Sequence, residues 1–191
     1  MDDLDERRYP VGPMPRNRAR LDRASRTPLI EIIGQAPATL RQLVDGLTDE
    51  QLDTPYRSGG WTIRQVMHHL PDSHMNAYVR MKLAVTESAP VIKPYDEAAW
   101  AELPEARTAP VAMSLDLLDA LHRRWTAFLI ALPDAEFQKP YTHPEIGPVT
   151  IDEALGMYAW HCRHHTAHVK LAVKNGAGVP PRGLLRRVRS R

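Results

Sequence analysis

The stretch T-I-D-E-A-L-G-M-Y-A-W-H-C-R-H-H-T-A-H-V, residues 150–169, combines the start of a helix with a line of histidines. Thr150 and Glu153 have the spacing of a capping box, and Gly176 supplies a stop after Lys174. Four histidines fall within eight positions, and helical geometry places all four on one stripe roughly 100° wide. The stretch therefore predicts a long amphipathic helix whose histidine stripe borders its buried face.

The histidines of this stripe have the spacing of metal ligands: His161, His164, His165 and His168. Positions 161 and 165, like positions 164 and 168, stand one helical turn apart, so both rings of either pair could reach one ion. A third ligand must come from elsewhere, and the other paired histidines are His68 and His69. Three imidazoles around an open position are typical of catalytic zinc. The alternative is a pH-responsive or solvated helix face.

Three further helices are predicted from capping signals and apolar spacing. The first begins at Thr27 with Pro28 in its first turn, and the second begins at Ile63 and continues, kinked, through Pro71. The third begins at Ser114. The connections 86–112 and 133–149 are long, and strand-like alternation is almost absent. The expected fold class is all-α, a four-helix bundle with long connecting loops.

Composition and length limit the remaining possibilities. We expect an extended N-terminal arm over 1–26, one bundle domain over 27–176 and a basic C-terminal tail over 177–191. The net charge of +2 gives no case for nucleic acid or membrane partners. The single cysteine, Cys162, excludes an internal disulfide, and no secretory signal is present. We therefore expect a cytoplasmic protein in which Cys162 is a buried, inert thiol.

Five stretches of the chain resemble the DinB/YfiT-like superfamily, and particularly its YfiT branch of metal-dependent hydrolases. They are Y-P-V-G at 9–12, L-D-T-P-Y-R-S-G-G-W-T-I-R-Q-V-M-H-H-L at 52–70, D-S-H-M-N at 72–76, K-P-Y-D-E-A-A-W-A-E-L at 93–103, and A-L-G-M-Y-A-W-H-C-R-H-H-T-A-H at 154–168. The resemblance implies a four-helix bundle that holds one divalent metal per chain, zinc or nickel. Carried over by position, the ligands are His69, His161 and His165. It also implies a homodimer.

A divalent ion held by three neutral imidazoles supports two kinds of chemistry. It can activate water for hydrolysis, or it can bind and activate the thiolate of a low-molecular-weight thiol for transfer to an electrophile. The metal-dependent hydrolase is our first expectation and the thiol S-transferase the second, each with a small-molecule substrate. A non-enzymatic metal-binding stress protein is the third.

The remaining candidate residues follow from position. Candidates for proton transfer beside the metal are His164, His68 and Asp72. Candidates for contacting a substrate are Lys93, Tyr95 and Asp96 in the connection 86–112, which could equally be a structural cover or part of a dimer interface. The isolated histidines, His74, His122 and His143, are expected to be structural or exposed.

Overall fold

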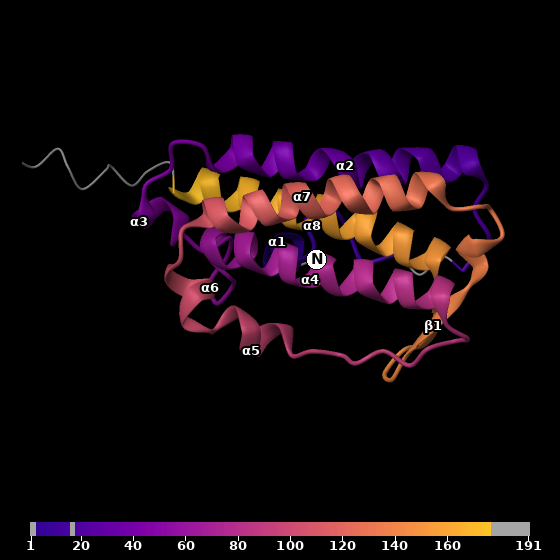
Figure 1. The fold of residues 1–191 in the computed structure, drawn as a ribbon. Coiled ribbons are helices and arrows are strands. Elements are labelled where there is room, and N and C mark those ends of the chain that lie inside the picture. The colour runs from indigo at the N-terminus through magenta and orange to yellow at the C-terminus, as the bar shows by residue number, and fades with distance from the viewer. Residues whose placement is uncertain (1–2, 16–17, 177–191) are drawn as a thin grey trace, which may run out of the picture.

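Four long helices lie side by side in the computed structural model, which describes residues 3–15 and 18–176 (Figure 1). They are α2 (Arg23–Val44), α4 (Ile63–Thr86), α7 (Val111–Ala131) and α8 (Ile151–Gly176). Helix α2 packs against α7 and α8, and α4 packs against the same two helices. Helix α2 is therefore diagonal to α4, and α7 is diagonal to α8, while α8 lies beside α4. The predicted all-α four-helix bundle is confirmed.

The connections carry short elements. The long connection 86–112 contains α5 (Glu97–Ala101) and α6 (Pro104–Thr108), which pack on α4. Asp96 caps α5, and Pro104 occupies the first position of α6, so each helix begins with a local signal. The connection 133–149 holds a 3₁₀ turn (Glu136–Gln138) and a hairpin of β1 (Pro140–His143) and antiparallel β2 (Gly147–Thr150).

The start predicted for the first long helix is wrong. Helix α2 begins at Arg23 rather than Thr27, because the Asp22 side chain accepts a hydrogen bond from the Ser25 amide. The arm is also not simply extended, since α1 (Asp3–Arg8) lies within it. A smaller correction applies to α7, which starts at Val111, three residues before the predicted Ser114.

The long helices accommodate their internal prolines without ending. Helix α2 continues past Pro28 and Pro37, and α4 continues past Pro71, as predicted for α4. Capping boxes are present in α3 (Asp49–Leu52) and α4, where Thr48 and Thr62 pair with the glutamine three residues later. Thr150 and Glu153 exchange the same reciprocal hydrogen bonds at the start of α8.

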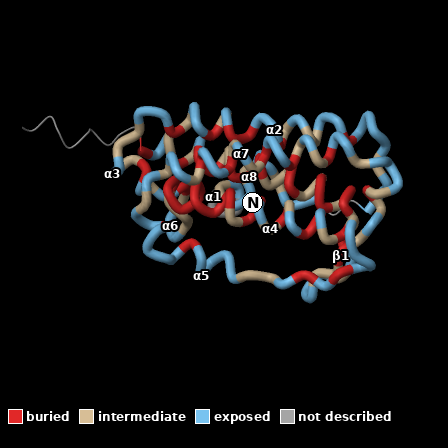
Figure 2. The backbone as a smooth tube through the Cα atoms, viewed as in Figure 1, coloured by how far each residue is buried: buried red, intermediate tan, exposed pale blue. Residues whose placement is uncertain are grey.

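Buried residues lie mainly on the sides of the long helices that face one another (Figure 2). The core consists of two apolar clusters with a histidine-rich layer between them. One cluster contains the α8 residues Leu155 and Cys162, and the other contains Val169. On α4 the first cluster includes Met81 and the second includes Met67. The polar layer lies between them, and its buried members are His69, Ser73, His74, His122, His164, His165 and His168. Because buried polar groups are costly without partners, this layer must be internally hydrogen-bonded or bind a ligand.

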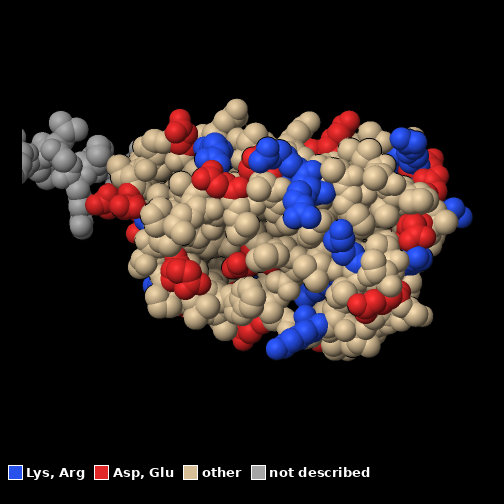
Figure 3. All heavy atoms as spheres, viewed as in Figure 1, with Lys and Arg blue, Asp and Glu red and all other residues tan. Residues whose placement is uncertain are grey.

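The surface charge and the C-terminal end of the chain do not help to locate a functional site. Acidic and basic side chains are mixed over the face drawn in Figure 3. Within 3–15 and 18–176, none of the helices is both long and apolar enough to cross a bilayer. The basic tail predicted for 177–191 lies outside the described residues.

Candidate metal centre

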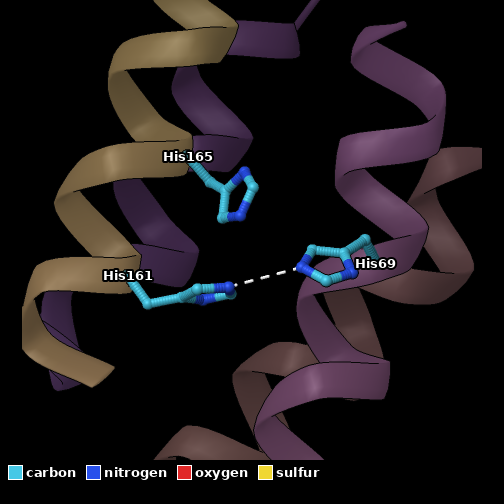
Figure 4. Close-up of side chains that lie close together, drawn as sticks. All are labelled: His69, His161 and His165. Carbon is cyan, nitrogen blue, oxygen red and sulfur yellow. Dashed lines mark hydrogen bonds between the residues drawn. The ribbon is translucent and has the colours of Figure 1, made fainter. Parts of the chain in front are cut away.

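Three histidines from two helices converge in the polar layer (Figure 4). His69 projects from α4, while His161 and His165 project from successive turns of α8. One ring nitrogen from each residue lies within 4.8 Å of the other two. The structure thus brings together the three residues implied by the family resemblance, and their identity as metal ligands stays a prediction.

The spacing of the ring nitrogens suits a small divalent ion. The Nε2 atoms of His69 and His161 are 3.3 Å apart. Zinc–nitrogen bonds of about 2.0–2.1 Å in a tetrahedron place two ligand nitrogens about 3.3–3.4 Å apart. The donor set is all imidazole, which zinc, copper, iron and nickel accept. The three residues therefore fit an ion of the predicted kind.

Burial keeps these imidazoles in the neutral form that a metal requires. Burial lowers the pKa of His69 to about 4. It also lowers the pKa values of His161 and His165 well below their usual range, and the neighbouring histidines add to the effect. Neutral rings have a nitrogen lone pair available at pH 7, so a cation could bind without first displacing a ring proton.

Aromatic side chains enclose the site. The Trp61 ring lies 4.7 Å from the His69 ring and is nearly parallel to the His165 ring at 6.4 Å. On the other side, Tyr158 lies 5.7 Å from His161. The Tyr56 ring stacks on the neighbouring His168 ring at 3.8 Å. Such walls limit water and lower the local dielectric, which strengthens electrostatic interactions inside the site.

The three candidates for proton transfer lie in different environments. His68 turns away from the three histidines, since its ring nitrogens contact the Ser114 hydroxyl at 2.7 Å and the Ala109 carbonyl at 3.1 Å. Asp72 has its pKa raised to about 6 by burial and by the nearby Glu105 of α6. Neither belongs to the group of converging ligand atoms.

His164 is the candidate that lies next to the ligands. Its ring is 5.0 Å from the His165 ring and stacks on Trp160 at 4.3 Å. Its Nδ1 atom is buried and has no hydrogen-bond partner among the residues that the structure describes. Burial lowers the pKa of His164 to about 4, which makes it a weak base at neutral pH.

A cleft of about 580 Å³ is lined by Ser73 and Tyr158, which lie one helical turn along the chain from His69 and His161. Its walls include Ser73, Arg80, Tyr95, Asp96, His143 and Tyr158. Two of the three predicted substrate-contacting residues, Tyr95 and Asp96, therefore line it. Lys93 does not line the cleft with its side chain, but its carbonyl accepts a hydrogen bond from Arg80 at 3.2 Å. His143, expected to be structural or exposed, also faces this cleft.

Arg80 is a cleft residue that the sequence analysis missed. Its side chain is buried, and it forms no salt bridge with a carboxylate among residues 3–15 and 18–176. Asp96 and Glu97 line the same cleft from exposed positions, so the buried floor is cationic and the rim is acidic. The residue type gave no signal for this, because an arginine in a helix is usually exposed.

His74 and His122 were also missed as members of the site. Both are almost completely buried, and Nδ1 of His74 lies 2.7 Å from Nε2 of His122. A signal was present, since His122 follows Leu118 by four residues and precedes Trp125 by three, which places it on the buried stripe of α7. Cys162 is buried as predicted, and burial raises the pKa of its thiol to about 12.

Comparison with known proteins assigns the chain to a family. The family model described as the DinB superfamily matches residues 32–169. The chain therefore belongs to the DinB superfamily. It is 49% identical over 162 residues to YfiT of Bacillus subtilis, which is named as a candidate metal-dependent hydrolase, and this covers 84% of the chain and 90% of YfiT. A similarly named Bacillus mycoides protein is 53% identical over 140 residues, covering 73% of the chain and 80% of that protein.

A solved structure shows the same arrangement of helices. The structure of YfiT from Bacillus subtilis, described as having an unusual four-helix bundle topology, matches with a TM-score of 0.86 and 45% sequence identity. The match covers 90% of this chain and 98% of that one. The resemblance to the YfiT branch is thus confirmed for both sequence and fold.

Proposed function

We propose that this DinB-superfamily chain is a metal-dependent enzyme that acts on a small molecule bound in the cleft beside its three histidines. The observation that carries the proposal is the convergence of three neutral imidazoles, of which His69 and His165 are buried and His161 is half-buried. The relatives named as candidate metal-dependent hydrolases support it. A divalent ion in this site, zinc or nickel, would supply a strongly polarising charge that lowers the pKa of a water or thiol it binds.

Hydrolysis is the first proposed reaction. The three histidines would hold the ion, and Trp61 and Tyr158 would exclude bulk water from it. The residues that line the cleft would position the bond to be hydrolysed. His164 is the residue best placed to take up a proton, because its buried Nδ1 has no partner within 3–15 and 18–176 and its ring lies 5.0 Å from the His165 ring.

Thiol transfer is the second proposed reaction, and the scarcity of strong bases beside the histidines favours it. The converging group contains no carboxylate among the described residues, and the pKa of His164 is lowered to about 4. Hydrolysis needs a group that accepts the proton of water, whose unperturbed pKa is about 15.7. A thiol, with an unperturbed pKa of about 8.5, loses its proton far more readily and needs less help from the protein.

The cleft supports a substrate that carries an anionic group. Arg80 presents a buried guanidinium with no carboxylate partner among the described residues, and a buried cation gains most from an ionised partner. The acidic Asp96 and Glu97 at the rim would favour a positive or neutral group at the outer end of the same molecule. We also propose that the protein forms a homodimer, as the family resemblance implies.

One experiment separates the two reactions. The purified protein is loaded with zinc or with nickel and incubated with a panel of small esters and amides, and separately with aryl chlorides and epoxides, each with and without cysteine. Turnover with water alone supports hydrolysis, and conjugates that form only with the thiol support transfer. Fully loaded protein that turns over nothing in either panel, at any thiol concentration, would count against an enzyme and favour the metal-binding stress protein.

A further inference from the structure

The two α8 histidines of the site each contact a further histidine through the ring nitrogen that faces away from the ion position. Nδ1 of His161 lies 2.9 Å from Nε2 of His74. Nδ1 of His74 lies 2.7 Å from Nε2 of His122, and Nδ1 of His122 lies 2.6 Å from the carbonyl oxygen of Ile33. Three imidazoles in series therefore link α8, α4 and α7 to a backbone carbonyl of α2.

The carbonyl at the end of this series determines the proton position on every ring. A carbonyl only accepts, so Nδ1 of His122 carries the hydrogen, and a neutral imidazole then has an unprotonated Nε2. His74 must donate to that nitrogen from Nδ1, which leaves its own Nε2 as the acceptor for His161. His161 in turn is protonated on Nδ1 and has its lone pair on Nε2, the atom that faces His69.

Burial supports the neutral state on which this reasoning depends. A charged imidazole at the position of His74 or His122 would be buried away from water, which is costly. Both rings are almost completely buried, so water does not compete for their nitrogens.

A second, shorter series reaches His165. Nδ1 of His165 lies 3.4 Å from Nδ1 of His168, and Nε2 of His168 lies 3.2 Å from the carbonyl oxygen of Arg8. By the same logic, His168 donates from Nε2 to Arg8 and accepts at Nδ1 from His165. The lone pair of His165 is then on Nε2. Arg8 is the last residue of α1, so the N-terminal arm supplies the end of this series.

We propose that these two imidazole series, which end on the carbonyls of Ile33 and Arg8, preset His161 and His165 to bind a metal through Nε2. His74, His122 and His168 are then positioning residues. A ring in the other tautomer would direct an N–H bond at the cation, so fixing the tautomer in advance removes a reorganisation step from metal binding. This inference rests on the metal site of the proposed function but not on the reaction that the site performs.

The direct test reads the tautomers in the full-length, metal-free protein. Long-range ¹H–¹⁵N spectra of protein labelled on histidine, recorded at pH 7.5, distinguish a protonated Nδ1 from a protonated Nε2. We expect protonated Nδ1 at His122, His74, His161 and His165, and protonated Nε2 at His168. His143, on the hairpin, is the internal reference. A protonated Nε2 on His161 would overturn the inference.

Substitution of His122 tests the effect on metal binding. His122→Phe removes both hydrogen bonds, and we expect zinc affinity, measured by competition with a chromogenic chelator, to fall about 10- to 100-fold. His122→Gln is the matched control, because its amide nitrogen can donate to Ile33 while its oxygen accepts from His74. We expect it to retain most of the affinity. Equal zinc affinity in His122→Phe and the parent would contradict the inference.

The outcomes distinguish this inference from the proposed function. If His122→Phe does not fold, the tautomers of the parent protein still decide the question. Protein with the expected tautomers and the expected affinity change, but with no turnover in any panel, would refute the enzyme and leave the inference intact. Turnover in protein whose His161 has the other tautomer would support the enzyme and refute the inference.

Discussion

The Nε2 atoms of His69 and His161 lie 3.3 Å apart, although 92 positions separate the two residues in the chain. This distance is close to that between two ligands of a tetrahedral zinc ion. We predict that His69→Ala, His161→Ala and His165→Ala each abolish stoichiometric binding of zinc and nickel, because two remaining imidazoles rarely hold an ion alone. Metal content after dialysis, measured by mass spectrometry, checks this.

The matched control for the metal prediction is His143→Ala. His143 lies on the hairpin, outside the group of converging nitrogens, so its loss should leave metal content unchanged. Retention of a full equivalent of metal by any of the three ligand variants would show that the ligand assignment is wrong.

Arg80 should control substrate affinity rather than metal binding. We predict that Arg80→Met raises KM for an anionic substrate about 10- to 100-fold, since a hydrogen bond to a charged group contributes about 1.5–3 kcal/mol. Arg80→Lys should have an intermediate KM, because lysine keeps the charge but lacks the planar fork. Metal content should be the same in both variants. Steady-state kinetics with an unchanged KM for Arg80→Met would exclude this role.

The ion pair of Arg26 with Asp152 should contribute strongly to stability. Both side chains are almost completely buried, with Nε of Arg26 2.7 Å from Oδ1 of Asp152, and the pair joins α2 to the start of α8. We predict that Arg26→Leu lowers the free energy of unfolding by about 3–5 kcal/mol, because it leaves a buried carboxylate without its cation. Denaturant unfolding checks this value.

The matched control on the same helix is Arg41→Leu. Arg41 also pairs with an aspartate, Asp116, but both side chains are exposed. We expect this substitution to change the free energy of unfolding by less than about 1 kcal/mol. Equal effects of the two substitutions would mean that burial does not determine the contribution of these pairs.

Metal-free protein should lose stability in mild acid. Burial lowers the pKa of His122 to about 4, so between about pH 6.5 and pH 4 the unfolded chain binds a proton that the folded protein does not. The stabilisation is therefore complete above about pH 6.5 and is lost as the pH falls towards 4. For His122 alone the loss is about 3 kcal/mol, since one pKa unit corresponds to about 1.4 kcal/mol.

Denaturant unfolding in the presence of a chelator, at pH 7, 6 and 5, measures this dependence. His122→Gln does not titrate in this range, so its free energy of unfolding should fall less steeply than that of the parent protein. A free energy of unfolding that does not change between pH 7 and 5 would show that the buried histidines are not held neutral by the fold.

Much of the helical architecture was predictable because its signals are local. The capping boxes at Thr62 and Thr150 and the apolar spacing between them depend on residues within one or two turns. The start of α2 was missed because two competing local signals lie close together, and Asp22 prevails over Thr27. The short helices α5 and α6 were missed because five residues give no detectable period.

The sequence by itself determined that α8 carries a histidine stripe and that two pairs on it have ligand spacing, since both follow from 3.6 residues per turn. It left open which pair faces the second helix, and only the family resemblance chose between them. The tertiary structure decided that α4 and α8 are neighbours, which places His69 against His161, and that α7 adds His122 to the same layer. These contacts join residues that are 48 to 92 positions apart, so they depend on how whole helices pack and not on any local pattern.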